Sequence, residues 1–272
     1  MDGRARGGCL FPGRANSSSG RADHRTRLWE VSSGRLLLNL VGHEAGVNAV
    51  AFAPSGELVT TVGDNTVRLW ELPSGRPHGT CVSQSGHSRC LAFSADGRTL
   101  AVGSFDHIFA VDLWDPITAT RKGRLTDPGT ATAQGRLTSA VQPTGEANFG
   151  VASVAFSPDD ATLAAGCSDG VIRLWDVASG DMRLTLSGHV GVISRLAFAP
   201  DGRSLASLGE DNVLDLWHLA TGQQLLKLDS RGQELHGLAF SSDGRILMAG
   251  ARSASKDGPS SLLMWRTDEA GP

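Results

Sequence analysis

Several features that would assign a chain to a common functional class are missing from this sequence. No uninterrupted apolar stretch approaches the roughly 20 residues that a membrane-spanning helix requires. The formal net charge is only −3, so the chain as a whole has no electrostatic attraction for nucleic acid. We therefore expect neither a membrane segment nor a nucleic-acid partner.

Cysteine is also scarce, and the four that are present share no metal-ligand spacing: Cys9, Cys81, Cys90 and Cys167. Cys90 and Cys167 fall in predicted strands, where a reduced thiol is an ordinary small core residue. The sequence contains no Gly-rich phosphate loop and no nucleophile elbow. These absences predict no metal, no cofactor and no catalytic residue, and they favour a cytoplasmic location, or a nuclear one in a eukaryote.

What the sequence does contain is a repeat of aromatic residues. Phenylalanines at 52, 93, 156, 198 and 240 follow the first five tryptophans of the repeat, and four of these five intervals are 23 residues long while the remaining one, to Phe156, is 42. A spacing held this tightly indicates repeated structural units. The repeats end near six tryptophans, which are Trp29, Trp70, Trp114, Trp175, Trp217 and Trp265.

The stretch from Gly188 to Trp217 shows what each repeat contains. Apolar residues alternate over 193–198, and Pro200-Asp201-Gly202 then supplies turn chemistry before a second strand runs back. A third strand ends at Trp217, and a fourth is predicted over 223–228. A single four-stranded meander cannot bury both of its faces, so copies of it must stack on one another.

Short motifs within the repeats identify the family that the chain resembles. Gly-His occurs at 42–43, 86–87 and 188–189, and Leu-Trp-Glu or Leu-Trp-Asp at 69–71, 113–115 and 174–176. With an Asp six residues before the Trp, these motifs resemble the WD-repeat β-propellers over roughly residues 19–266. The resemblance implies an all-β propeller of four-stranded antiparallel blades.

The ends of the chain fit this architecture less well. Residues 1–18 are rich in Gly and Arg and are predicted to be a disordered arm, followed by the propeller over 19–268 with an insertion at about 126–147. The chain enters the first repeat halfway through, and no fourth strand is expected after Trp265. We therefore expect five nearly complete repeats, an N-terminal half-repeat and an incomplete ring, as in a fragment, an isoform or part of a longer product.

In this family a His, a Ser or Thr, the turn Asp and the Trp of a repeat form a buried hydrogen-bonded tetrad. A charged Asp that accepts from an imidazole and the adjacent backbone stabilises a blade by about 1.5–3 kcal/mol per bond. A catalytic triad would not recur in successive repeats, so the structural interpretation is favoured. The resemblance implies two full tetrads, His43, Thr60, Asp64 and Trp70, and His189, Ser207, Asp211 and Trp217. It also implies partial tetrads that contain His87, Asp106, Trp114, Asp169 and Trp175.

Partner-binding positions follow from the same resemblance, at the start of each inner strand and just before each turn Asp. They map to Asn48, Arg89, Ser194 and His236, and to Phe105, Ser168 and Glu210. Phe105 is either an exposed anchor or a ring folded onto its own turn. The insertion is either a plain surface loop or a partner-binding loop.

These observations predict a non-catalytic scaffold that presents the upper rim of a propeller to a protein or peptide. One alternative is a sensor or regulatory propeller from a larger signalling protein, such as one linked to a kinase. A second, from a different class, is a propeller hydrolase or lactonase. Because an open ring exposes unpaired strands and apolar flanks, we also expect self-association through open blade edges.

Overall fold

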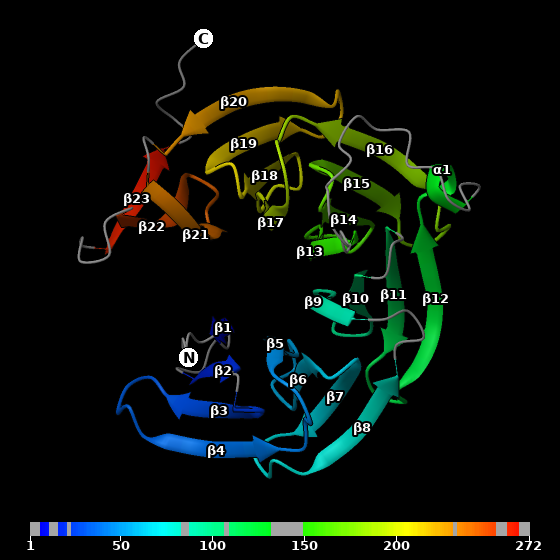
Figure 1. The fold of residues 1–272 in the computed structure, drawn as a ribbon, viewed down its shortest axis with the longest axis vertical. Coiled ribbons are helices and arrows are strands. Elements are labelled where there is room, and N and C mark those ends of the chain that lie inside the picture. Colours follow the sequence, from blue (N-terminus) through cyan, green and yellow to red (C-terminus); the bar gives the residue numbers. More distant parts are fainter. Residues whose placement is uncertain are drawn as a thin grey trace. The chain divides into compact units, whose positions relative to one another are not determined.

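The computed structural model describes residues 6–10, 16–20, 23–82, 87–105, 109–131, 149–230, 233–253 and 260–266 of the 272-residue chain. These residues form 23 strands and one short helix. The strands lie in six antiparallel sheets, which we call blades 1 to 6 in chain order. The predicted all-β class of four-stranded antiparallel blades is therefore confirmed (Figure 1).

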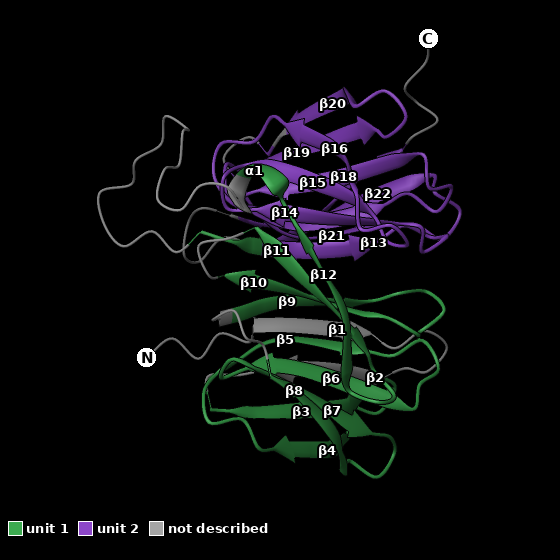
Figure 2. Cartoon of the chain, turned by 90° about the vertical axis from the view of Figure 1, so that its right-hand side faces the viewer, with its two compact units in different colours: residues 1–151 green, residues 152–272 purple. Residues whose placement is uncertain are grey.

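The chain divides into two compact units, residues 1–151 and 152–272 (Figure 2). Unit 1 contains blades 1, 2 and 3, whose strands follow one another as meanders. Their bounds are β1 (Arg6–Leu10), β2 (Asn16–Gly20), β3 (Arg25–Glu30), β4 (Leu36–Val41), β5 (Val47–Phe52), β6 (Leu58–Gly63), β7 (Thr66–Glu71), β8 (Pro77–Val82), β9 (His87–Phe93), β10 (Leu100–Phe105), β11 (Ala110–Asp115) and β12 (Thr120–Thr126), followed by α1 (Pro128–Ala131).

Blades 4, 5 and 6 follow from residue 151 onward, and blade 6 has three strands in the described residues. The bounds are β13 (Val151–Phe156), β14 (Thr162–Cys167), β15 (Val171–Asp176), β16 (Met182–Ser187), β17 (Ile193–Phe198), β18 (Ser204–Gly209), β19 (Val213–His218), β20 (Gln223–Asp229), β21 (Gln233–Phe240), β22 (Ile246–Ser253) and β23 (Ser260–Arg266). Within unit 1 the first strands β1, β5 and β9 are neighbours and the fourth strands lie outermost (Figure 1).

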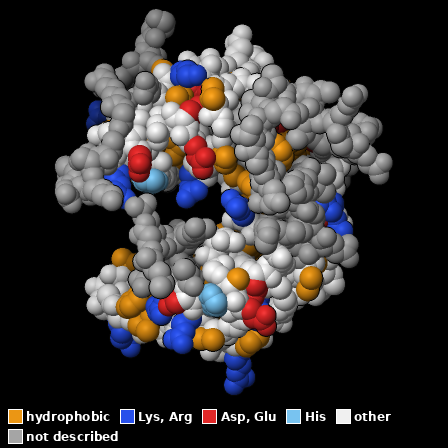
Figure 3. All heavy atoms as spheres, in the orientation of Figure 1, with side chains coloured by type: hydrophobic (Ala, Val, Ile, Leu, Met, Phe, Trp, Pro, Cys, Tyr) orange, Lys and Arg blue, Asp and Glu red, His pale blue; other side chains and the backbone are white. Residues whose placement is uncertain are grey.

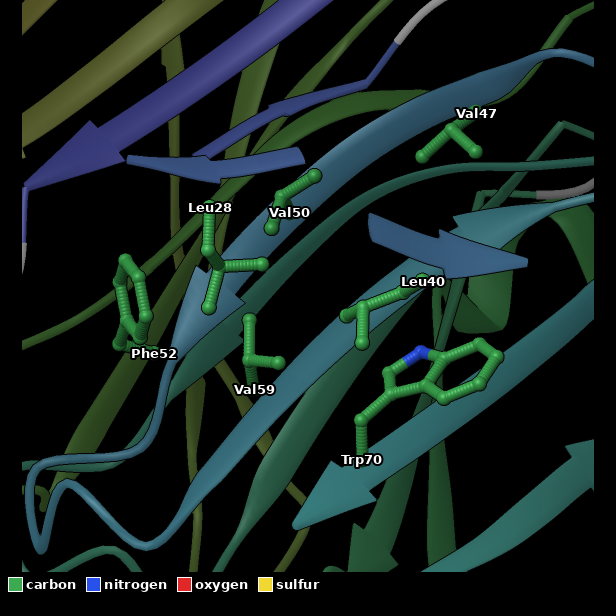
Figure 4. Close-up of a cluster of buried hydrophobic side chains, with 7 residues drawn as sticks. All are labelled: Leu28, Leu40, Val47, Val50, Phe52, Val59 and Trp70. Carbon is green, nitrogen blue, oxygen red and sulfur yellow. The ribbon is translucent and has the colours of Figure 1, made fainter. Parts of the chain in front are cut away.

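Apolar side chains from neighbouring blades form the core, because one sheet alone cannot bury both of its faces. Between blades 1 and 2, Leu28 and Leu40 pack against Val50, Val59 and Trp70 (Figure 4). Equivalent clusters lie between blades 2 and 3, 4 and 5, and 5 and 6. In the clusters of blades 2, 3 and 5 the repeat tryptophan packs toward the preceding blade, which explains why its spacing is held so closely.

The hairpins between first and second strands repeat one turn device. In blade 3 the hydroxyl of Ser94 donates to Asp96 at 2.6 Å and accepts from the N–H of Thr99 at 2.9 Å. The same pair of bonds recurs at Ser157 in blade 4 and Ser241 in blade 6. These short side chains satisfy turn backbone groups that no strand can pair with.

The start of the chain differs from the prediction of a disordered arm and a half-repeat. β1 and β2 pair with each other and β2 pairs with β3, so blade 1 is a four-stranded sheet. Both segments are Gly- or Ser-rich and show no alternation of apolar residues, which is why the sequence did not predict strands. Here pairing with β3 through backbone hydrogen bonds overrides weak local preference.

The predicted insertion at about 126–147 lies between β12 and β13. Its first residues end β12 and form the four-residue helix α1, and 132–148 lie outside the described residues. None of the helices in the described ranges is long and apolar enough to cross a membrane.

Candidate interaction rim

The tetrad of blade 5 comes together from β18, β19, the turn between them and the loop before β17. The N–H at Nδ1 of His189 donates to Asp211, whose two oxygens lie 3.2 and 3.3 Å away. The hydroxyl of Ser207 lies 2.7 Å from Nε2 of His189 and accepts from the indole N–H of Trp217 at 2.8 Å. Ser207 is fully buried, so no substrate can reach this Ser-His-Asp set. Its hydrogen bonds stabilise the blade.

Blade 2 has the same set of hydrogen bonds, but its hydroxyl residue is not the threonine that the sequence predicted. His43 Nδ1 lies 2.7 Å from Asp64 and Nε2 lies 2.8 Å from the hydroxyl of Thr61, which accepts from the indole of Trp70 at 2.9 Å. The prediction that Thr60 belongs to this tetrad is wrong. Its hydroxyl is buried and, among the described residues, has no hydrogen-bond partner.

The choice of Thr60 was wrong because the β6–β7 hairpin is shorter than the matching hairpin of blade 5. Thr61 lies nine residues before its tryptophan, whereas Ser207 lies ten before its own. The β6–β7 hairpin turns on Asp64 and Asn65 alone, both with positive φ, of 43° and 61°, as in a two-residue type I′ turn. The β18–β19 hairpin is one residue longer, and a one-residue shift sends a strand side chain to the other face.

The hydrogen bonds around both turn aspartates favour their charged forms. Burial acts to raise the pKa of Asp64, but bonds from Thr66 and the N–H of Glu44 outweigh it, and the pKa lies below its usual value. Burial of Asp211 is likewise outweighed by backbone N–H groups, the first from Val190, and its pKa is lowered. Both side chains are therefore carboxylates at neutral pH.

A second partner of the turn Asp was missed by the sequence analysis. Four residues after it, an arginine on the third strand turns back to the carboxylate in blades 1, 2 and 4. Arg173 is bidentate to Asp169, at 3.1 and 2.8 Å, and Arg27 lies 2.7 Å from Asp23. The Asp-x-x-x-Arg spacing in Asp23, Asp64 and Asp169 could have revealed it, because bidentate Arg–carboxylate pairs hold a fixed geometry.

In blades 3 and 5 an aspartate takes the place of that arginine. Asp112 is buried, and Arg121 lies 2.7 Å from it. Asp215 is fully buried opposite Ser207, accepts from Gln224 at 2.6 Å, and lies 3.5 Å from Nε2 of His189.

Burial raises the pKa of Asp215, although His189, Gln224 and Lys227 act in the opposite direction. His189 is thus flanked by two carboxylates, one on each ring nitrogen. This arrangement is absent from blade 2, where Arg68 stands at the matching position.

The predicted partial tetrads are incomplete to different degrees. Asp169 is held by Arg173 and by the N–H of Val171, and Trp175 is fully buried. In blade 3 the indole N–H of Trp114 is buried without a hydrogen-bond partner among the residues that the structure describes, because Val102 occupies the hydroxyl position. Asp106 and the side chain of His87 lie outside the described residues.

The rim residues predicted in unit 1 are Asn48, Arg89 and Phe105. Arg89 is exposed and its guanidinium carbon lies 4.2 Å from the centre of the Phe105 ring. Phe105 itself is buried, so it supports Arg89 and is not an exposed anchor. Asn48 is half-buried and donates to the carbonyl of Ser88, which links β5 to β9.

In unit 2 the predicted positions are Ser168, Ser194, Glu210 and His236. Glu210 and His236 are exposed, with His236 3.6 Å from Glu234. Ser194 donates to the carbonyl of Leu208 at 3.1 Å, and Ser168 is half-buried. The structure therefore leaves Glu210 and His236 available to a partner, while Ser194 is engaged by its own blade.

Two exposed residues at the same end of the blades were missed. Glu44 and Val190 each follow the tetrad His, and their N–H groups donate to the turn Asp at 2.6 and 2.8 Å. Val190 is 81% exposed. In each unit we call the end of the blades where first strands begin the interaction rim, with exposed residues Glu44 and Arg89 in unit 1 and Val190, Glu210 and His236 in unit 2.

The face shown in Figure 3 carries Lys, Arg, Asp and Glu side chains interspersed with apolar ones. Within the described ranges, no group of three or more His, Cys, Asp or Glu side chains is placed to hold a metal ion.

Comparison with known proteins agrees with the propeller blades. Residues 43–257 match a β-propeller family model described as "Nucleolar protein 10-like, N-terminal domain". The chain belongs to the WD-repeat β-propeller family. The resemblance stated from the Gly-His and Leu-Trp motifs is thereby confirmed.

Relatives of this propeller include mitochondrial division protein 1 of Pyricularia oryzae, 28% identical over 224 residues, which cover 65% of this chain and 33% of the relative. Pre-mRNA-processing factor 19 of Oryza sativa subsp. japonica is 28% identical over 193 residues, covering 69% and 33%. Small ribosomal subunit protein RACK1y of the same plant is 30% identical over 171 residues, covering 59% and 43%. The chain thus spans between 33% and 43% of the length of these relatives.

Proposed function

We propose that this propeller is a non-catalytic scaffold that binds a protein or peptide through its interaction rim. The observation that carries the proposal is the fixed presentation of exposed rim residues. The turn carboxylates of Asp64 and Asp211 hold the backbones of Glu44 and Val190, while the same carboxylates are locked by buried histidines. A rigid backbone loses little conformational entropy when it binds.

The names of the relatives support a binding role over a shared reaction. These names refer to three different cellular processes or assemblies: mitochondrial division, pre-mRNA processing and the small ribosomal subunit. A fold that recurs across such settings favours a surface that recognises partners. The cytoplasmic or nuclear location expected from the sequence stays a prediction.

A catalytic role is not part of the proposal, because the Ser-His-Asp groups are structural. Ser207 has no exposed surface and already accepts from Trp217. A hydrolase would need an accessible nucleophile beside its base. Glycerolipid, ester and lactone substrates incubated with the purified chain should therefore show no turnover above the rate of a Ser207→Ala variant.

The proposal is tested by affinity capture with rim variants. A partner identified by mass spectrometry should bind the unchanged chain, and Val190→Asp or Glu210→Ala should weaken the complex at least tenfold. Ile117→Asp is the matched control, since Ile117 is 68% exposed in the β11–β12 turn at the opposite end of its blade. Loss of binding in Ile117→Asp with full binding in both rim variants would contradict the proposal.

A further inference from the structure

The turn aspartate of blade 5 differs from those of blades 2 and 4 in the charge that surrounds it. Asp64 lies 3.5 Å from Arg68, and Asp169 is bidentate to Arg173. Among the described residues, Asp211 forms an ion pair with His189 and with no lysine or arginine. Blade 5 therefore has a turn carboxylate whose charge no permanent cation of the described chain offsets.

An acid, Asp215, stands where blade 2 has its arginine. A Cβ atom placed on Gly42 would lie 2.8 Å from Nη1 of Arg68, and one placed on Gly188 would lie 3.3 Å from Oδ2 of Asp215. Both glycines immediately precede the histidine of their tetrad. Oδ2 of Asp215 is fully buried, has no hydrogen-bond partner in the described part of the chain, and lies 3.5 Å from Nε2 of His189. Blade 5 thus has a second acid in place of the cation.

The surface above these two acids is apolar and acidic. Val190 is 81% exposed, more than any other large apolar side chain among the described residues. Its N–H donates to Asp211 at 2.8 Å, so its side chain stands next to a carboxylate that keeps 14% of its own surface exposed. Glu210 precedes Asp211, is exposed, and pairs with no lysine or arginine that the structure describes.

The charge balance at this end of blade 5 favours a cation from outside. Three acidic residues, Glu210, Asp211 and Asp215, are gathered around one imidazole. Asp211 is a carboxylate at neutral pH, as its lowered pKa requires, and a partly buried charge is screened by salt less than an exposed one. A cation that approaches blade 5 therefore gains electrostatic energy that it would not gain at the turn aspartates of blades 2 and 4, where an arginine already lies.

We propose that the segment of the partner that docks on the rim of blade 5 is basic. Its lysine or arginine contacts Asp211 and Glu210, and an apolar side chain beside that cation packs on Val190. The partner thereby supplies from outside the charge that Arg68 and Arg173 supply within their own blades. This inference rests on the proposed function and adds the chemistry of the partner to it.

The first experiment selects ligands for the full chain from a random-peptide library displayed on phage. The selected peptides should be enriched in Lys or Arg next to an apolar residue. In fluorescence anisotropy, Glu210→Gln should weaken binding of a synthesised basic peptide at least threefold. Asp181→Asn is the control and should leave binding unchanged, because Asp181 is exposed in the β15–β16 turn at the opposite end of blade 4.

The outcomes separate this inference from the proposed function. Selected peptides that have no basic residue, yet lose binding in Val190→Ser, would overturn the inference and leave the proposed function standing. Basic peptides whose binding changes in neither Glu210→Gln nor Val190→Ser bind outside the rim, and they would overturn the inference as well.

An internal arginine tests the same inference without altering the exposed surface. Asp215→Arg restores the Asp-x-x-x-Arg spacing of blades 2 and 4, and blade 2 shows that an arginine at this position is compatible with a complete tetrad. The variant should bind the basic peptide at least tenfold more weakly than the unchanged chain, with circular dichroism as the check of folding. Equal affinity of a folded Asp215→Arg variant and the unchanged chain would contradict the inference, and Glu210→Gln keeps it testable if Asp215→Arg does not fold.

Discussion

Two neighbouring threonines of β6 should respond in opposite ways to the same substitution. Thr60 and Thr61 are both fully buried, and valine matches threonine in shape and in strand preference. Thr61→Val removes the acceptor of the Trp70 indole and the partner of Nε2 of His43. Each buried group left unpaired costs about 1–3 kcal/mol, so the variant should lose roughly 2–4 kcal/mol of unfolding free energy.

Thr60→Val removes a hydroxyl that has no hydrogen-bond partner among the described residues. Exchanging it for a methyl group should leave stability unchanged or raise it by up to about 1 kcal/mol. Urea denaturation followed by tryptophan fluorescence measures both variants, and both lie in unit 1, so they report on the same transition. Equal losses, or a larger loss for Thr60→Val, would refute the assignment of Thr61 to the tetrad.

Further predictions concern the two carboxylates beside His189. Asp211→Ala should lose about 2 kcal/mol in denaturant melts at pH 7, because three hydrogen bonds end on that side chain. Since the pKa of Asp211 is lowered in the fold, this difference should shrink as the pH falls below about 4. Asp215→Asn should instead stabilise the chain at pH 7, because the raised pKa of Asp215 means that its charge is disfavoured in the fold. That gain should disappear below about pH 4, where the acid is protonated in both states, and a destabilised Asp215→Asn at pH 7 would contradict the assignment. Trp217→Ala should cost about 3–5 kcal/mol by calorimetry, since the ring is buried between blades 4 and 5, and a loss below 1 kcal/mol would contradict that packing.

The repeat spacing predicted the order of strands well because the tryptophan performs the same packing task in successive blades. His189, Ser207, Asp211 and Trp217 could be identified for the same reason, since that blade has a hairpin of the standard length. Thr60 was chosen wrongly because a spacing counted along the chain cannot detect a turn that is one residue shorter. Only strand register shows which face a side chain occupies.

Other features depend on tertiary contacts that one sequence does not reveal. β1 and β2 have weak strand preferences and form by pairing onto β3. The sequence left Phe105 as either an exposed anchor or a ring folded onto its own turn, and the structure shows it buried beneath Arg89. The turn Asp meets an arginine in blade 4, a histidine in blade 5 and both in blade 2, so the full set of its partners is seen only in the folded blade.

The central claim, that the rim residue held by Asp211 meets a protein partner, is tested most directly by site-specific photo-cross-linking. A photoreactive amino acid replaces Val190 in one form of the chain and Ile117 in another, and each is irradiated in the presence of the captured partner. The account predicts a cross-link from position 190 that excess unmodified chain competes away, and none from position 117. Cross-linking from 117 alone, or from neither position under conditions where the complex forms, would contradict it.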